Sequence, residues 1–303
     1  MLNSLIFVFL CLVWGSTWLA IKIGLEGSPP FLGAGFRFAI AAAFLFALSA
    51  LTGKLNFTFD GKIRKVVVAA FMIYPIPYGL VYWGTQYVES GMAAVLFATM
   101  PFFVAVLAHL FIEGERLTIP KVLGMVIGFG GILLIFADNL GAKGLIGILG
   151  MAAVSISSFF SAAGTVYSKR HFHDIDPVSM TAFQSFIGAI ALSSLGFAFE
   201  SISQYRFDIR TVGSLFYLGI FGTSLTFTLY FFVLKRMETT KLSTIAFITP
   251  VMALILGSVA YGESFDILSI VGSIMVVAGV FTVVMGDTLF KRRPATVAPV
   301  NWE

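Results

Sequence analysis

Hydroxyl-bearing side chains recur at helical spacing inside long apolar segments of the chain. Tyr74, Tyr78 and Tyr82 follow one another at intervals of four residues, and Ser161 and Thr165 share one side of a later segment. Polar side chains are costly inside a bilayer unless they face a cavity or a partner. Aromatic walls with a few hydroxyl groups suit an amphipathic solute. We therefore expect a solute-binding cavity, with these candidate lining residues: Thr17, Trp18, Tyr74, Tyr78, Tyr82, Thr99, Ser161, Thr165, Thr223, Tyr230 and Ser243.

Each of these residues, taken singly, also has a purely structural interpretation. A Ser or Thr in a membrane helix often bonds to its own helix or packs in a close helix contact. Tyrosines can instead form a belt at the membrane interface, although Tyr78 lies too near the centre of its segment for that role. The cavity interpretation depends on several such stripes falling in related segments.

Charged side chains are rare inside the apolar segments. Arg37 lies about 9 Å from the end of its segment, at 1.5 Å per residue. It could snorkel outward, attract a solute carboxylate or pair with a protein group, and the first and third roles are favoured. Glu115 and Glu263 each follow a Gly just beyond a segment, where we expect gating or capping contacts with neighbouring basic residues. With the prolines Pro101 and Pro250, these three residues form the set of gating or structural candidates.

Acidic residues are expected only in loops, at segment ends or in the tails. A carrier coupled to protons or sodium commonly uses a membrane carboxylate, so this pattern favours a gradient-driven uniporter. His109 could titrate in a relevant range, but packing is its favoured role. The run from His171 to Asp176 could bind a metal, although a solvated loop is the favoured interpretation.

The composition identifies the elements that must position these residues. Of 303 residues, 58% are hydrophobic and only 11% are charged, against about 25% charged in a typical soluble domain. Nearly uninterrupted apolarity favours helices over a barrel, whose strands alternate in polarity. The sequence predicts an all-α integral membrane protein with ten transmembrane helices, near 3–24, 31–52, 65–85, 91–112, 119–138, 144–167, 176–199, 211–234, 240–261 and 265–286.

The chain contains an internal repeat with an offset of 147 to 149 residues. The corresponding pairs, in order, are Lys22 and Lys169, Pro30 and Pro177, Phe36 and Phe183, Glu89 and Glu238, Pro101 and Pro250, Glu115 and Glu263, Gly124 and Gly272, and Gly131 and Gly279. Each copy holds five segments, so the second copy is inverted in the membrane. Inverted repeats are a recurrent architecture of secondary transporters, which bind solute between the repeats near the midplane. We expect a first repeat at 3–141, a second at 142–287 and a short tail at 288–303.

The basic residues indicate the orientation of the chain. Fourteen Lys and Arg residues lie on the side of the two termini, and four lie on the other side: Lys22, Lys143, Arg206 and Arg210. By the positive-inside rule both termini are expected to be cytoplasmic. The expected location is the plasma (inner) membrane, so the lipid bilayer is a partner and nucleic acid is not.

Several of these positions resemble the EamA-type branch of the drug/metabolite transporter superfamily. The resemblance rests on the run from Trp14 to Trp18 with Lys22, on Pro30 with Arg37, and on the segment from Ala93 through Pro101 to Leu117. The second copy repeats Pro250 and Gly262-Glu263 but has Gln184 in place of Arg37 and Ser264 in place of Arg116.

The resemblance implies a carrier of small organic metabolites, with no cofactor. The length and aromatic richness of the chain are similar to those of amino-acid exporters in this superfamily, including the YddG type that exports aromatic amino acids. Phosphate-bearing solutes would need more cationic cavity residues than Arg37 alone. We therefore expect a secondary transporter that exports amino acids, aromatic and other neutral ones favoured, or similar small metabolites by alternating access. The alternatives are a proton-coupled exporter of another metabolite or drug, a channel, and an integral-membrane enzyme; a monomer is compatible with the sequence.

Overall fold

The apolar segments fold into helices throughout the part of the chain that the structure describes. This structure is a computed structural model, and it describes residues 2–51, 61–112, 116–142, 144–172, 174–234 and 245–290. Seven segments form single helices: α1 (Leu2–Leu25), α2 (Pro30–Leu51), α7 (Ile119–Ala142), α8 (Gly144–His171), α9 (Pro177–Phe199), α13 (Ile245–Tyr261) and α14 (Ile267–Phe290). A short 3-10 helix, η1 (Ile202–Gln204), lies in the loop after α9.

Three further segments are interrupted near their middle. The pieces are α3 (Ile63–Ile73) and α4 (Pro75–Thr85), α5 (Ser90–Phe97) and α6 (Met100–Phe111), and α10 (Ile209–Gly219), η2 (Ile220–Leu225) and α11 (Thr226–Leu234). Pro75 and Pro101 cause the first two breaks, because proline has no N–H to donate and its ring clashes with the preceding turn. The third break, η2, is a π-helix, an element that is rare and concentrated at functional sites.

The ten predicted segments are all occupied by helices in the described residues. Nine of these are long and apolar enough to cross a membrane, and the apolar part of α13, Ile248–Tyr261, is shorter. The helices α7, α8 and α14 each continue four residues beyond their predicted ends, and α8 ends at His171. Its last turn carries Lys169 and Arg170, and cations there are stabilised by the helix dipole. The all-α membrane fold predicted from the sequence is therefore confirmed.

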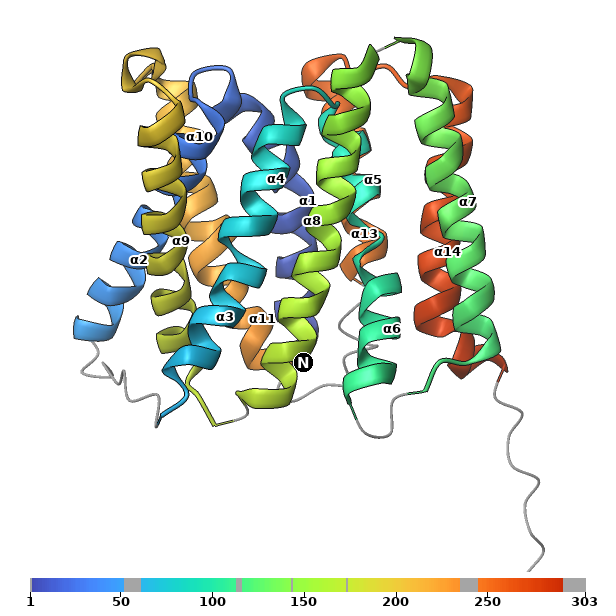
Figure 1. Cartoon of the computed structure of the whole chain (residues 1–303), viewed down its shortest axis with the longest axis horizontal. Coiled ribbons are helices and arrows are strands. Elements are labelled where there is room, and N and C mark those ends of the chain that lie inside the picture. The colour runs from blue at the N-terminus through green and yellow to red at the C-terminus, as the bar shows by residue number, and fades with distance from the viewer. Residues whose placement is uncertain are drawn as a thin grey trace, which may run out of the picture.

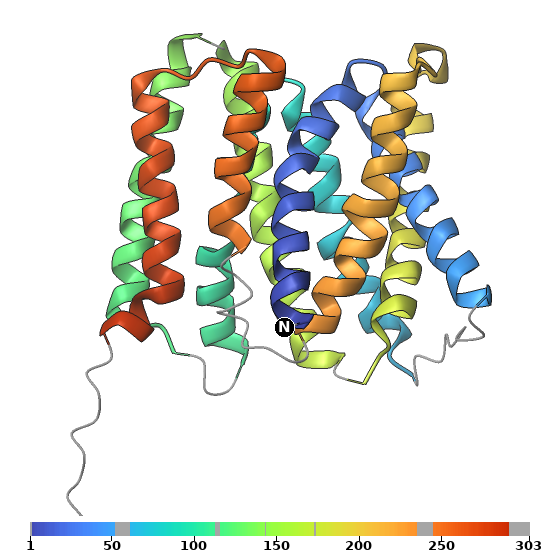
Figure 2. The same ribbon diagram turned by 180° about the vertical axis from the view of Figure 1, so that it is seen from behind.

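The two repeats run in opposite directions through the bundle. In Figure 1, α1 begins at the lower edge, which we call the terminal face, whereas α8, the first helix of the second repeat, begins at the upper edge, which we call the far face. The two most extensive helix pairs join repeat counterparts, α7 with α14 and α2 with α9. Figures 1 and 2 both show the α7–α14 pair standing at one end of the bundle.

Glycines allow α7 and α14 to approach closely. A Cβ atom on Gly124 would lie 2.5 Å from the Gly279 carbonyl oxygen, and one on Gly131 would lie 2.5 Å from the Gly272 oxygen. Gly124 matches Gly272 in the repeat, and Gly131 matches Gly279. Exchanging the two repeats therefore turns the Gly124–Gly279 contact into the Gly272–Gly131 contact, as a two-fold axis between the repeats requires.

Candidate functional site

A cavity of about 160 Å³ lies among helices of both repeats. It is lined by Trp14, Thr17, Trp18, Ile21, Arg37, Ile73, Pro77, Tyr78, Val81, Phe97, Ala98, Met100, Pro101, Val104, Ser161, Thr165, Phe227, Tyr230, Ile245 and Thr249. The lining is mostly apolar, with a few hydroxyl groups and one cationic side chain. None of the described residues in this lining is acidic.

Six of the eleven predicted binding residues line this cavity. They are Thr17, Trp18, Tyr78, Ser161, Thr165 and Tyr230. Trp14 also lines it, although it was singled out only as part of a motif. Trp14, Thr17, Trp18 and Ile21 recur at helical spacing on α1, so helical periodicity applied to Thr17 and Trp18 would have pointed to Trp14 and Ile21 as well.

The other predicted binding residues lie outside the lining. Tyr74 is fully buried between α3 and α4, where its ring contacts those of Phe38 and Phe227. Tyr82 is also buried, with 2% of its surface exposed. The Thr99 hydroxyl donates to the Leu96 carbonyl oxygen and lies 2.9 Å from the Ser158 hydroxyl oxygen. Thr223 contacts Arg37, as described below, and Ser243 lies outside the described residues.

The break between α3 and α4 explains why the tyrosine stripe divides. Side chains at intervals of four residues share a face only along a continuous helix. Because α3 ends at Ile73 and α4 begins at Pro75, Tyr74 occupies the break and is not part of the stripe. Of the three tyrosines, only Tyr78 lines the cavity.

Arg37 points into the bundle rather than toward the membrane surface. Its side chain is 1% exposed. The Nε atom donates to the Thr223 hydroxyl at 2.8 Å, and Nη2 donates to the Gly222 carbonyl oxygen at 3.1 Å. The guanidinium carbon lies 4.7 Å from the centre of the Tyr78 ring, within the range of a cation–π interaction. The outward-snorkelling role is therefore wrong, and Arg37 contacts protein groups.

The π-helix supplies the acceptors that hold Arg37. Gly222 and Thr223 both lie within η2, where the usual i to i−4 hydrogen-bonding pattern is replaced. No proline marks this break, and it was not predicted from the sequence. The contact links α2 of the first repeat to η2 of the second at the wall of the cavity.

Lys22 joins α1 to α4 just beyond the cavity on its far side. Its Nζ atom donates to the carbonyl oxygens of Thr85 and Val88, each at 3.3 Å. The lining residue Ile21 directly precedes Lys22, and the lining residue Val81 lies one turn before Thr85. This contact therefore bridges the end of α1 and the end of α4 immediately beyond the cavity.

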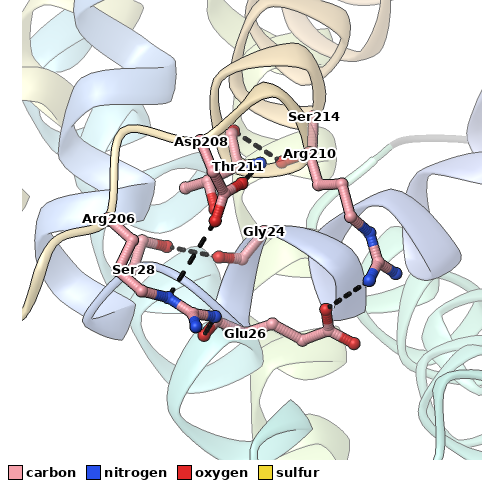
Figure 3. A network of polar contacts seen from close by, with 8 residues as sticks. All are labelled: Gly24, Glu26, Ser28, Arg206, Asp208, Arg210, Thr211 and Ser214. Carbon is pink, nitrogen blue, oxygen red and sulfur yellow. Dashed lines mark hydrogen bonds and ion pairs between the residues drawn. The ribbon is translucent and has the colours of Figure 1, made fainter.

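Glu26 is the centre of a polar network at the far face (Figure 3). Its carboxylate lies 3.2 Å from Nη1 of Arg210 and accepts a hydrogen bond from the Tyr261 hydroxyl. Its carbonyl oxygen accepts a hydrogen bond from Arg206. Glu26 belongs to the first repeat and its three partners to the second. The network therefore links the repeats, and an exposed ion pair of this kind contributes only about 0–1 kcal/mol.

Glu263 caps a helix of the opposite repeat. Its carboxylate accepts hydrogen bonds from the backbone N–H and hydroxyl of Ser90 and from the backbone N–H of Gly91, at 2.8, 2.7 and 3.1 Å. These groups form the N-terminus of α5, where a negative charge is favoured. The sequence predicted capping contacts with basic residues. Glu263 does cap a helix, but its partners are backbone N–H groups and the Ser90 hydroxyl.

Two further acids cap helices at the far face, and the sequence analysis did not single them out. Glu200 accepts hydrogen bonds from the backbone N–H groups of Phe31 and Leu32 at the start of α2. Asp208 accepts one from the Thr211 N–H, at 2.9 Å, at the start of α10 (Figure 3). This bond holds the pKa of Asp208 below its usual value.

The remaining gating candidates occupy different places. Pro101 lines the cavity, whereas Pro250 is buried inside α13. Glu115 lies outside the described residues.

The acidic run after α8 makes one contact with the first repeat and one helix cap. Asp174 pairs with Lys62 at 2.7 Å, and Asp176 caps α9 by accepting the Ser179 N–H at 2.8 Å. Over the described residues, no group of three or more His, Cys, Asp and Glu side chains is placed to hold a metal ion.

Comparisons with known proteins agree with the fold. The profile of the EamA-like transporter family matches residues 2–137 and 148–285, one match in each repeat. The uncharacterized transporter YoaV of Bacillus subtilis (strain 168) is 30% identical over 282 residues, covering 93% of this chain and 95% of that protein. The uncharacterized inner membrane transporter YedA of Escherichia coli (strain K12) is 30% identical over 303 residues, covering 96% and 93%.

A protein of known crystal structure shares the fold, with a TM-score of 0.72 at 18% identity over 96% of this chain and 99% of that chain. The family profile covers most of the chain in two matches, and the two EamA-like segments are consistent with duplicated repeats. The chain therefore belongs to the EamA-like transporter family of the drug/metabolite transporter superfamily, and it is a secondary transporter and not an enzyme.

Proposed function

We propose that this transporter exports amino acids, with aromatic and other neutral ones favoured, or similar small metabolites. The observation that carries the proposal is the cavity between the repeats. Trp14, Trp18 and Phe227 provide aromatic walls, and Ser161 and Thr165 provide hydroxyl groups. Such a lining suits a solute with an apolar body and a small polar head.

Alternating access is the proposed mechanism. The far side of the cavity is closed by contacts of Lys22, and further out Glu26 and Glu263 each bond to the opposite repeat. On α8 and α13 the lining residues lie in the half of the helix nearer the terminal face, for example Thr165 and Thr249, whereas on α1 they lie in the half nearer the far face, for example Trp18. We infer a state in which solute enters from the terminal face, because more of the described contacts between the repeats lie at the far face than at the terminal face, where Lys62 pairs with Asp174.

The direction of transport depends on the orientation of the chain in the membrane. The excess of Lys and Arg on the terminal face supports a cytoplasmic location for that face. The similarity to YedA, whose name places it in the inner membrane, supports a bacterial inner-membrane location. A cavity loaded from the terminal face would then deliver solute outward.

The proposed energy source is the solute gradient alone. Proton- and sodium-coupled carriers commonly place a carboxylate within the membrane, and none of the residues lining this cavity is acidic. A uniport mechanism is consistent with this lining.

Counterflow into liposomes that contain the purified protein tests the proposal. We expect saturable uptake of a radiolabelled neutral amino acid that is accelerated by unlabelled amino acid inside, with no imposed pH or sodium gradient. Nucleotide sugars and polyamines are the comparison solutes. Absence of saturable amino-acid flux under any gradient would refute amino-acid export, and flux that requires a pH or sodium gradient would refute uniport.

A further inference from the structure

We propose that Arg37 forms a carboxylate-binding subsite in the cavity, so that transported solutes carry a carboxylate and an apolar body. This inference rests on the proposed function, because it concerns the same cavity. In this proposal Nη1 of Arg37 binds the solute carboxylate, and the positive charge of the guanidinium group excludes cationic solutes from that position.

The guanidinium group of Arg37 has unfilled hydrogen-bonding capacity. Arg37 is almost fully buried, and Nε and Nη2 have protein acceptors. Its Nη1 atom is buried and has no hydrogen-bond partner in the described structure. A buried donor without an acceptor is unfavourable, so a solute acceptor placed there would gain a full hydrogen bond.

The positive charge of Arg37 has no negative partner among the described residues that line the cavity. The guanidinium group stays protonated in proteins. The Gly222 carbonyl and the Thr223 hydroxyl that accept its hydrogen bonds are neutral, and so are the nearby side chains of Tyr78 and Tyr82. None of the described residues lining the cavity is acidic. A buried charge without a partner is costly, so an anionic group on the solute would supply the missing countercharge.

The guanidinium group of Arg37 is held in position without a solute. The hydrogen bonds to η2 fix one edge of the group, and the Tyr78 ring lies 4.7 Å from its central carbon. A side chain fixed in this way loses less entropy when it binds a solute. Charge-assisted bonds from guanidinium to carboxylate are among the stronger hydrogen bonds in proteins.

The rest of the cavity indicates what the carboxylate is attached to. Trp14, Trp18, Phe97 and Phe227 line the space next to Arg37. These side chains favour an apolar or aromatic body. A single cationic side chain matches a monoanion better than a phosphate, which needs several charged donors once it loses its water.

Tryptophan fluorescence offers a direct binding test, because Trp14 and Trp18 both line the cavity. The chain has four tryptophans, so Trp83→Phe and Trp302→Phe leave only the two cavity tryptophans as reporters. The matched probes are 3-phenylpropionate and its neutral amide, which have the same body and differ in charge. Neither probe absorbs at the wavelength that excites tryptophan.

We expect the acid to bind at least about tenfold more tightly than the amide, since a charge-assisted bond is roughly twice as strong as a neutral one. Arg37→Gln, which introduces the residue found at the corresponding position 184, should reduce this ratio to within about threefold by weakening only the acid. Arg37→Lys keeps the charge but not the planar fork, so it should retain part of the preference.

Equal binding of acid and amide to the wild-type protein would overturn the proposal, and this comparison needs no variant that could fail to fold. Equal weakening of both probes by Arg37→Gln would also overturn it, because a purely structural role predicts that result. Failure of both probes to bind, or tighter binding of phenyl phosphate than of 3-phenylpropionate, would do the same.

The binding test and the counterflow test can fail separately. Acid-selective binding that depends on Arg37, without amino-acid counterflow, would support the subsite and refute amino-acid export. Amino-acid counterflow with equal binding of acid and amide would support export and refute the subsite.

Discussion

The two inverted repeats line the same cavity with different side chains. Trp14 and Ser161 are 147 residues apart, as are Trp18 and Thr165, so each pair occupies corresponding positions in the repeat. All four residues line the cavity. The first repeat therefore supplies large aromatic rings where the second supplies small hydroxyl groups, and the cavity is asymmetric although the scaffold is an inverted pair.

Arg37 and Gln184 show the same divergence. Arg37 donates to η2 and lines the cavity, whereas both side-chain amide atoms of Gln184 are buried without a hydrogen-bond partner in the described structure. The glycines joining α7 to α14, by contrast, correspond between the repeats. The comparison indicates that the glycine contacts between α7 and α14 keep the repeat symmetry, while the cavity residues differ between the repeats.

The largest expected effect comes from breaking the symmetric contact between α7 and α14. In Gly131→Ala the new Cβ would lie 2.5 Å from the Gly272 carbonyl oxygen, so the helices must separate. Overpacking of this kind costs about 1–3 kcal/mol, and we expect a lower midpoint of thermal unfolding in detergent. The adjacent Gly130→Ala is the control, because its Cβ would meet only the flexible end of Met275, at 3.3 Å. Equal unfolding midpoints for the two variants would contradict the proposed close contact.

The next effect tests the asymmetry of the cavity directly. Trp18→Thr installs the residue of the second repeat in the first and removes an aromatic wall. We expect the affinity for an aromatic amino acid, measured by counterflow, to fall about thirtyfold, or ~2 kcal/mol. Thr165→Val keeps the size but removes the hydroxyl group, and it should cost less, about 1 kcal/mol. A larger loss for Thr165→Val than for Trp18→Thr would reverse the assignment of the two walls.

A smaller effect distinguishes the two tyrosines of α4. Tyr78 lines the cavity and Tyr82 does not. Tyr78→Ala should therefore weaken solute binding about tenfold, or ~1.4 kcal/mol, whereas Tyr82→Phe, which keeps the buried ring, should leave binding within about threefold. Both are measured by counterflow after correction for the amount of folded protein. A strong defect in Tyr82→Phe together with normal binding by Tyr78→Ala would place the solute elsewhere.

The smallest effect concerns the far-face network. Glu26→Gln removes an exposed ion pair worth about 0–1 kcal/mol. The equilibrium constant for opening of the far face should therefore rise by at most about fivefold. The measurement is alkylation of Ile21→Cys from the far face, in a chain whose native Cys11 is replaced by Ala. Arg210→Gln should match Glu26→Gln, and the double variant should add nothing further. Additive effects would show that the two residues act separately.

The sequence predicted the scaffold more completely than the cavity. Apolar length and the matched residues of the repeat identified every helical segment, because membrane thickness and inversion constrain both. The rotation of each helix about its axis was less certain. Tyr74 left the predicted stripe because α3 ends one residue before it, and Arg37 turned inward because η2 offered acceptors that no sequence motif marked.

In the proposed alternating-access mechanism, one cavity between the repeats opens to the two faces in turn. Alkylation of Ser161→Cys by a membrane-impermeant maleimide, in the chain with Cys11→Ala, tests this claim most directly. Without solute, we predict reaction from the terminal face and protection from the far face. With a transported amino acid present, reaction from the terminal face should slow and reaction from the far face should appear. Reaction from both faces at once without solute, or rates that no transported solute changes, would contradict the account.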